Sequence, residues 1–250
     1  MQKFSGLKRS IIATVLAGVA MAAAAAPAQA AMILQLSDGV DTVTVLDGGL
    51  RDSNPAVGAI TWIGSLGDFV INVSTALSQP AIGTSESAEL DLNSVNLYDA
   101  DGVGTSNVMT LELVDTDFTA GIGLPGTLTA HYGGTITNGT VVGQGWKNLC
   151  NTLHIERCDD LISVGPFAGG PGSFAFDDSI PHDVLTGAYS MYIRNVLTFT
   201  SDGVYSGDFH LINSPVPEPG SMILLGTGLV GLARTARRRL QKSRAAATQV

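Results

Sequence analysis

The sequence predicts an all-β domain, an antiparallel β-sandwich or jelly-roll-like fold, flanked by an N-terminal signal peptide and a C-terminal single transmembrane helix. Two observations predict the β domain. Apolar and polar side chains alternate in several short segments, which is the period of a half-buried strand. The central residues 31–216 also contain 24 glycines and no long apolar pattern of helical period. The flanking segments are indicated by a third observation, the distribution of charge.

The charge distribution divides the 250 residues into three pieces. Residues 1–30 carry three basic side chains and no acid, and residues 217–250 carry six basic side chains and one acid. The central piece carries only four basic residues against 21 acidic ones. Such an acidic body repels phosphate backbones, so nucleic acid is excluded as a partner.

The first piece, residues 1–30, has the features of a secretory signal peptide. A basic start precedes an apolar run over residues 11–26, and Pro27 ends that run. Ala28 and Ala30 occupy the two small-residue positions that signal peptidase reads, so we expect cleavage after Ala30. The run is shorter than the roughly 20 residues that span a bilayer, which favours a cleaved signal over an uncleaved anchor.

Residues 31–214 are predicted to form the extracytoplasmic β-sandwich domain. A change of phase near Asn93 and Ser94 indicates a β-bulge, and Asp202-Gly203 favours a hairpin turn. Residues 165–172, which are rich in glycine and proline, are expected to form a loop. The clearest alternating segments, each predicted to be a strand, are residues 69–73, 90–97, 109–113 and 191–199.

The two cysteines, Cys150 and Cys158, are eight positions apart. In an oxidising compartment we expect them to form a disulfide, which would close a short loop and contribute about 2–3 kcal/mol at most. The alternative is a metal site with His154 as a third ligand, although the spacing matches no zinc motif.

Asp99 and Asp101 resemble the start of a calcium loop, because oxygen ligands stand two apart and a glycine follows. The other positions do not fit an EF-hand. A looser Ca²⁺ site using Asp115 or Asp117 stays open, as does the alternative that these acids only favour turns and solubility. No other cofactor or metal is expected.

No catalytic residue is predicted, and we expect that the protein is not an enzyme. The sequence has no G-x-S-x-G motif, and its histidines show no metal-binding spacing. A secreted hydrolase, the less favoured alternative, would need a cleft that holds paired carboxylates or a His–Asp pair. The four histidines are His131, His154, His182 and His210.

Carbohydrate binding is the main alternative function for the domain. Sugar-binding sandwiches use exposed aromatic side chains with polar neighbours, and such a site requires Trp62 and Trp146 to be exposed together on one sheet face. Burial of the two tryptophans would contradict it. Tyr98 and Tyr132 are further aromatic candidates.

The last piece begins with Pro217, Glu218 and Pro219, which favour an extended backbone. The apolar residues 222–233 follow, and this short helix is expected to enter the membrane. The basic residues after it stay cytoplasmic by the positive-inside rule. At about 21 Å the helix is shorter than the hydrocarbon core, which suits temporary retention better than permanent anchoring, although a plain anchor is the alternative. The cytoplasmic cluster consists of Arg234, Arg237, Arg238 and Arg239.

The order of proline motif, short helix and arginine cluster over residues 215–240 resembles the PEP-CTERM sorting domain, also catalogued as the ice-binding protein C-terminal domain. The resemblance implies a Gram-negative bacterium, recognition of Pro217, Glu218 and Pro219 by a membrane exosortase, and removal of the helix. The protein would be an inner-membrane intermediate, then reach the cell surface or the extracellular space. Association with extracellular polysaccharide and biofilm is also implied. Residues 241–250 would be a cytoplasmic tail.

Ice binding is a further alternative for two reasons. The second name of the sorting domain refers to an ice-binding protein, and the sequence contains Thr-x-Thr pairs. An ice-binding face needs such pairs in ranks on neighbouring strands, whereas their spacing here is irregular. The pairs are Thr42/Thr44, Thr127/Thr129, Thr135/Thr137 and Thr198/Thr200.

Overall fold

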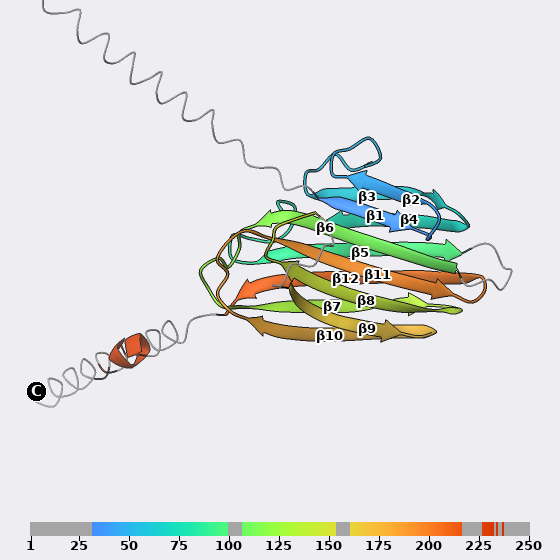
Figure 1. Cartoon of the computed structure of the whole chain (residues 1–250). Helices are drawn as coiled ribbons and strands as arrows, with labels where there is room; N and C mark the ends of the chain where they lie inside the picture. Colours follow the sequence, from blue (N-terminus) through green and yellow to red (C-terminus); the bar gives the residue numbers. More distant parts are fainter. Residues whose placement is uncertain are drawn as a thin grey trace, which may run out of the picture.

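Twelve antiparallel strands form two six-stranded sheets that pack face to face (Figure 1). The structure is a computed structural model, and it describes residues 32–99, 107–153, 161–216, 227–232, 234 and 237. The predicted signal peptide, including Ala28 and Ala30, lies outside the described residues. The sandwich expected for residues 31–214 is confirmed as the architecture of the described body.

The first sheet, here sheet A, is built from strands that are distant in sequence, and its two edges are β2 and β9. Its strands in order are β2 (Thr42–Leu46), β1 (Ile33–Ser37), β6 (Asn107–Phe118), β11 (Tyr189–Phe199), β8 (Gly139–Asn148) and β9 (Leu161–Gly169).

The second sheet, sheet B, has β10 and β3 at its edges. Its strands in order are β10 (Gly172–His182), β7 (Gly126–Ile136), β12 (Gly203–Pro215), β5 (Ala88–Asp99), β4 (Phe69–Leu77) and β3 (Ala59–Leu66).

The core lies between the two sheets and is supplied by alternate residues of each strand. In β5 the buried side chains are Leu90, Leu92, Val95 and Leu97, so the inward-facing set changes phase between Leu92 and Val95. Ser94 causes this change, because it has a φ of 52° and no partner position in β4. The predicted bulge at Asn93-Ser94 is therefore confirmed, and it keeps both halves of β5 facing the core.

The four segments predicted as strands all lie in strands, namely β4, β5, β6 and β11. The predicted hairpin at Asp202-Gly203 is wrong. β11 belongs to sheet A and β12 to sheet B, so this short connection crosses from one sheet to the other. A few residues suffice for the crossing, because packed sheets lie only about 10 Å apart.

The loop predicted for residues 165–172 is also wrong over most of its length. Residues up to Gly169 belong to β9, and β10 begins at Gly172. Gly165 has a φ of 86° and lies beside an irregularity in the pairing of β8 with β9. A proline next to a bulge on an edge strand is tolerated there, which explains why Pro166 does not end β9.

Aromatic rings from sheet B pack against glycines of sheet A. Tyr132 stacks on Phe209 with ring centroids 4.8 Å apart, and both rings are buried. Gly143 in β8 leaves room for this stack. A Cβ added at Gly143 would lie 2.3 Å from Tyr132 Cε1, closer than any ordinary contact.

Gly143→Ala is predicted to lower the free energy of unfolding by about 1–3 kcal/mol, because the added methyl group overpacks the core against Tyr132. Gly187→Ala is the control, since a Cβ there meets nothing within 4 Å and the backbone is not left-handed. Urea denaturation of the two variants measures the difference. Equal midpoints would contradict the close packing of β7 against β8.

Candidate functional site

The candidate sorting site begins where the last strand of the sandwich ends. Pro215 is the final residue of β12 and pairs with Gly126 of β7. The Val216 N–H then donates a hydrogen bond to the Pro125 carbonyl oxygen at 3.0 Å. Val216, the last described residue before the motif, is therefore bonded to the sandwich, and the predicted recognition residue Pro217 follows it directly in the sequence.

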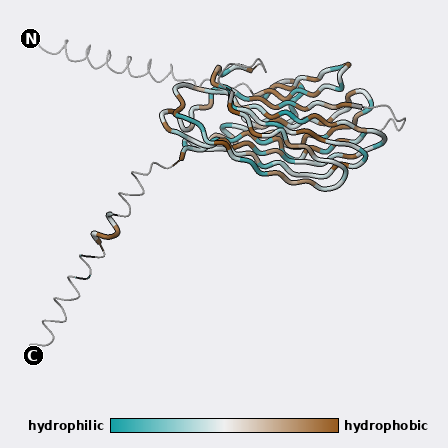
Figure 2. Tube along the Cα trace, turned by 60° about the horizontal axis from the view of Figure 1, so that its bottom comes forward, coloured by the Kyte–Doolittle hydropathy of each residue, from teal (hydrophilic) through white to brown (hydrophobic). Residues whose placement is uncertain are grey.

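Pro217, Glu218 and Pro219 lie outside the described residues, as do Arg238, Arg239 and the predicted tail 241–250. Residues 227–232 are helical and exposed. Leu229, Val230 and Leu232 are 52–69% exposed, and this stretch is mostly hydrophobic in Figure 2. Among the described residues no helix is long and apolar enough to cross a membrane. The rest of the predicted span, residues 222–226 and 233, is not described.

The outer face of sheet B carries a row of titratable side chains across four neighbouring strands. Asp177 of β10 is in register with His131 of β7, His131 with His210 of β12, and His210 with Asp91 of β5. Sequence reasoning missed this row, because its members come from strands that are far apart along the chain.

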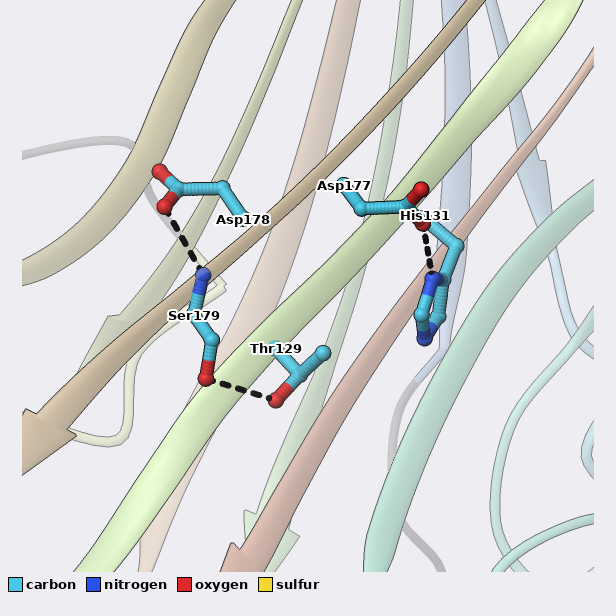
Figure 3. A network of polar contacts seen from close by, with 5 residues as sticks. All are labelled: Thr129, His131, Asp177, Asp178 and Ser179. Atoms are coloured by element: carbon cyan, nitrogen blue, oxygen red, sulfur yellow. Dashed lines mark hydrogen bonds and ion pairs between the residues drawn. The ribbon is translucent and has the colours of Figure 1, made fainter.

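Each histidine of this row contacts a carboxylate. His131 Nδ1 contacts Asp177 Oδ1, and the neighbouring strand positions carry a hydrogen bond of 3.3 Å between Thr129 and Ser179 (Figure 3). His210 Nε2 lies 3.1 Å from Glu89 Oε2. The His131–Asp177 pair is largely exposed, so water screens its charges and weakens the interaction.

Asp91 ends the row in a less accessible position. Its pKa is raised to about 7, first because burial disfavours the charged carboxylate and second because the Asp208 carboxylate lies nearby. A His–Asp pair and paired acids are thus present, as the hydrolase alternative requires. Both lie on the outer face of a sheet and not in a cleft between the sheets.

The calcium candidate is not assembled as expected. Asp101 lies outside the described residues, and Asp99 ends β5 at the edge of the undescribed residues 100–106. Asp115 and Asp117 lie toward the other end of β6, eight to ten residues along the strand from its first residue, Asn107. At the rise of an extended strand, this places them about 27–33 Å from Asn107. Within the described ranges, no group of three or more His, Cys, Asp or Glu residues could hold a metal ion.

Asp115 instead belongs to the buried interior. The Ser78 hydroxyl donates to its Oδ2 at 2.6 Å, and the Thr116 N–H donates to its Oδ1 at 2.8 Å. Burial raises the pKa of Asp115 to about 7, although these two hydrogen bonds oppose the rise.

The predicted disulfide stays a prediction, because Cys158 and His154 lie outside the described residues. Cys150 follows β8 in a turn, where its N–H donates to Asn148 Oδ1 at 2.9 Å.

The exposed tryptophan pair that the carbohydrate-binding alternative requires is not formed. Trp62 and Trp146 are each only 8% exposed, and they belong to different sheets. Trp146 packs with Tyr192 and Val114 on sheet A, and Tyr132 is in the core. Of these four described candidates, only Tyr98 is substantially exposed, at 44%. With so few aromatic residues, packing uses nearly all of them.

The Thr-x-Thr pairs do not form ranks on neighbouring strands. Thr42 and Thr44 lie on β2, whereas Thr198 lies on β11, and β1 and β6 separate these strands. Thr127, Thr129 and Thr135 lie on β7, in the other sheet. The arrangement required for ice binding is absent from the described strands.

A second feature that sequence reasoning missed is a polar cluster enclosed between the sheets. Lys147 of β8 and Asn213 of β12 are at most 1% exposed. The Lys147 ammonium group lies 3.0 Å from Asn213 Oδ1 and 5.4 Å from the ring centroid of Tyr189. Desolvation lowers the pKa of Lys147 to about 7.

Comparison with known families identifies the C-terminal segment. A family model described as a PEP-CTERM protein-sorting motif matches residues 215–239. The chain therefore carries this sorting motif, as the resemblance predicted. The motif implies an exported protein that is sorted through exosortase.

A comparison with curated proteins finds no match. Among solved structures, TmCBM61 in complex with β-1,4-galactotriose is similar at 9% identity and a TM-score of 0.29, covering 59% of this chain and 90% of that chain. The enzymatically active domain of bacteriophage CBA120 tailspike protein 4 is similar at 14% identity and a TM-score of 0.28, covering 61% of this chain and 20% of that chain.

A structure of infectious bursal disease virus, Gx strain, is similar at 11% identity and a TM-score of 0.25, covering 76% of this chain and 53% of that chain. At these scores and identities, none of the three similarities carries an argument about this protein.

Asp115→Asn is predicted to change the pH dependence of stability. The raised pKa means that the folded state binds more protons than the unfolded state between pH 3.8 and about 7, so Asp115 lowers stability as pH rises through this window. Relative to the wild type, the free energy of unfolding of Asp115→Asn should therefore rise by about 2–3 kcal/mol between about pH 5 and about pH 8.

Urea denaturation at the two pH values measures this change, and Asp68→Asn in the exposed β3–β4 turn is the control. Parallel pH profiles for Asp115→Asn and the wild type would contradict the assignment of a protonated buried carboxyl group.

Proposed function

We propose that this protein is a non-catalytic component of the cell surface or extracellular matrix of a Gram-negative bacterium. It is exported by its N-terminal signal peptide, and exosortase cuts it at its PEP-CTERM segment. The observation that carries the proposal is the matched sorting motif placed directly after a complete strand. The chain passes from Val216, which is hydrogen-bonded to the sandwich, to the motif without a linker.

The two ends of the chain support one topology. The N-terminal residues have the pattern of a secretory signal, so the acidic domain is delivered outside the inner membrane. The arginines after the apolar helix stay in the cytoplasm. The short helix then holds the protein in the membrane while exosortase acts. Removal of the helix and the arginines leaves a strongly acidic domain.

Among the described residues of the acidic domain, Arg51 is the one exposed lysine or arginine outside the ion pairs. Arg194 pairs with Glu112 at 3.3 Å, and Lys147 is buried between the sheets. Such a surface keeps a secreted protein soluble and disfavours contact with anionic lipid. The carboxylate and imidazole groups across β10, β7, β12 and β5 are hydrogen-bonding groups suited to sugar hydroxyls. We therefore propose extracellular polysaccharide as the partner of this face.

The alternative, a carbohydrate-binding module with an aromatic platform, loses its main support because Trp62 and Trp146 are buried on different sheets. The outer-face row is hydrophilic, so contact with polysaccharide through it would be polar and weak. This suits a matrix component better than a high-affinity lectin site.

Replacement of Pro217-Glu218-Pro219 by three alanines is predicted to abolish maturation in the native host. The variant should stay in the inner membrane and retain the residues after position 220, because exosortase no longer recognises it. Cell fractionation and intact mass of the purified protein measure both effects.

The matched control replaces Gln241, Lys242 and Ser243, which lie beyond the matched motif, by alanine. This control should mature like the wild type. Normal processing of the first variant would refute the assignment of Pro217, Glu218 and Pro219 as the recognition residues.

A further inference from the structure

Two buried side chains, one from each sheet, meet near the end of the sandwich from which the sorting segment leaves. Lys147 comes from β8 in sheet A, and Asn213 from β12 in sheet B. They are separated by 66 positions in sequence, yet Lys147 Nζ lies 3.0 Å from Asn213 Oδ1. Because a carbonyl bond is about 1.2 Å long, the amide carbon Cγ lies within about 4.2 Å of the amine.

We propose that Lys147 and Asn213 react with each other to form an isopeptide bond that joins the two sheets and releases ammonia. The bond that forms links Lys147 Nζ to Asn213 Cγ, and the bond that breaks is the one between Cγ and Nδ2. An amine and a primary amide become a secondary amide and ammonia, so the reaction needs no oxidant, reductant or external co-reactant.

The amine is suited to act as the nucleophile. Lys147 is fully buried, and none of the ion pairs among the described residues involves it. An isolated charge in such a place is costly, so burial lowers the pKa of Lys147 to about 7. A large share of the amine is therefore neutral at neutral pH, which is the form that attacks a carbonyl group.

The carbonyl group of Asn213 is polarised by a second donor. His182 Nε2 lies 2.8 Å from Asn213 Oδ1, and His182 Nδ1 lies 2.7 Å from the backbone carbonyl oxygen of Asp183. Asn213 Oδ1 is an acceptor, so the ring donates to it in the tautomer that carries a proton on Nε2. His182 then donates to the oxygen that becomes negatively charged when Lys147 attacks, as an oxyanion hole does.

The leaving group also has a partner. Asn213 Nδ2 lies 2.7 Å from the Tyr189 hydroxyl oxygen, which in turn donates to the Ala120 carbonyl oxygen at 2.9 Å. Burial raises the pKa of Tyr189, so the hydroxyl keeps its proton. It can deliver this proton to Nδ2 as the amide nitrogen becomes an amine. The proton released from Lys147 Nζ restores the phenol, and Nδ2 leaves as ammonia.

The surrounding backbone holds this group in place. Gly126 of β7 is in register with His182 of β10, and a Cβ at Gly126 would lie 2.6 Å from His182 Nε2. Only glycine therefore leaves room for the histidine to reach Asn213. With reacting atoms held near contact distance, the entropic barrier to the reaction is largely removed.

The cross-link would act where mechanical load enters the domain. Asn213 lies on the strand that leads into the sorting motif, two residues before its end at Pro215. A covalent bond from β12 to β8 passes a pull on the C-terminus to both sheets, instead of to the hydrogen bonds of β12 alone. This inference does not depend on the exosortase assignment.

The test is the intact mass of the mature protein, produced from the full chain with export and measured after reduction. The wild type should be lighter than its sequence by one ammonia. A tryptic digest should contain one branched peptide that carries both Lys147 and Asn213, with no cleavage after Lys147. Lys147→Met and Asn213→Ala should each show the full sequence mass.

Gly126→Ala is expected to slow the reaction at least tenfold, because it displaces His182, whereas Gly187→Ala should react like the wild type. A wild-type protein of full mass that trypsin cleaves after Lys147 would overturn the proposal. So would a protein that has lost ammonia but has a free Lys147, since cyclisation of an asparagine produces that result. The mass and the digest of the wild-type protein test the cross-link directly, so the proposal can be rejected even if a variant fails to fold.

Discussion

The structure depends on the pairing of β12, the last strand, on both of its sides. This strand is bonded to β7 and to β5 almost from end to end, and its alternate residues Tyr205, Phe209 and Leu211 fill the core. The sandwich is therefore complete only when the chain as far as Pro215 has left the membrane. A cut within β12 would remove backbone hydrogen bonds to both neighbouring strands, so the proposed exosortase cut is expected to fall after Val216.

The position of the sorting motif follows from this constraint. If a flexible linker joined the domain to the motif, the position of the cut would not affect the fold. In this chain no linker separates them, because Val216 is hydrogen-bonded to the sandwich and the motif residue Pro217 is the next residue. The fold and the sorting signal thus share a boundary. The same strand carries Asn213 into the buried cluster with Lys147, so the region that would bear load after sorting is also the one with a polar group between the sheets.

The sequence was sufficient for features with a local cause. Alternation of period two located β4, β5, β6 and β11, and the phase change located the bulge at Ser94. It was insufficient where partners are distant. A short connection with Asp202-Gly203 looks the same whether it joins paired strands or crosses between sheets, and only the pairing of β11 and β12 with other strands distinguishes the two.

The same distinction between local features and partners distant in sequence applies to the candidate sites. The sorting motif is contiguous, so its residues could be read directly. The outer-face row and the Lys147–Asn213 contact come from strands brought together by topology, and no spacing rule reveals them. Whether Trp62 and Trp146 are exposed could not be decided from the sequence, because their strands had no assigned faces, and packing covers both rings.

The most direct test of the account is the intact mass and location of the protein isolated from its native host. Processing at both ends predicts a species that starts near Ala31, ends between Pro217 and Gly220, and is found on the cell surface or outside the cell. A species that retains residues 237–250 in the inner membrane would contradict it, because the C-terminal segment would then be a permanent anchor.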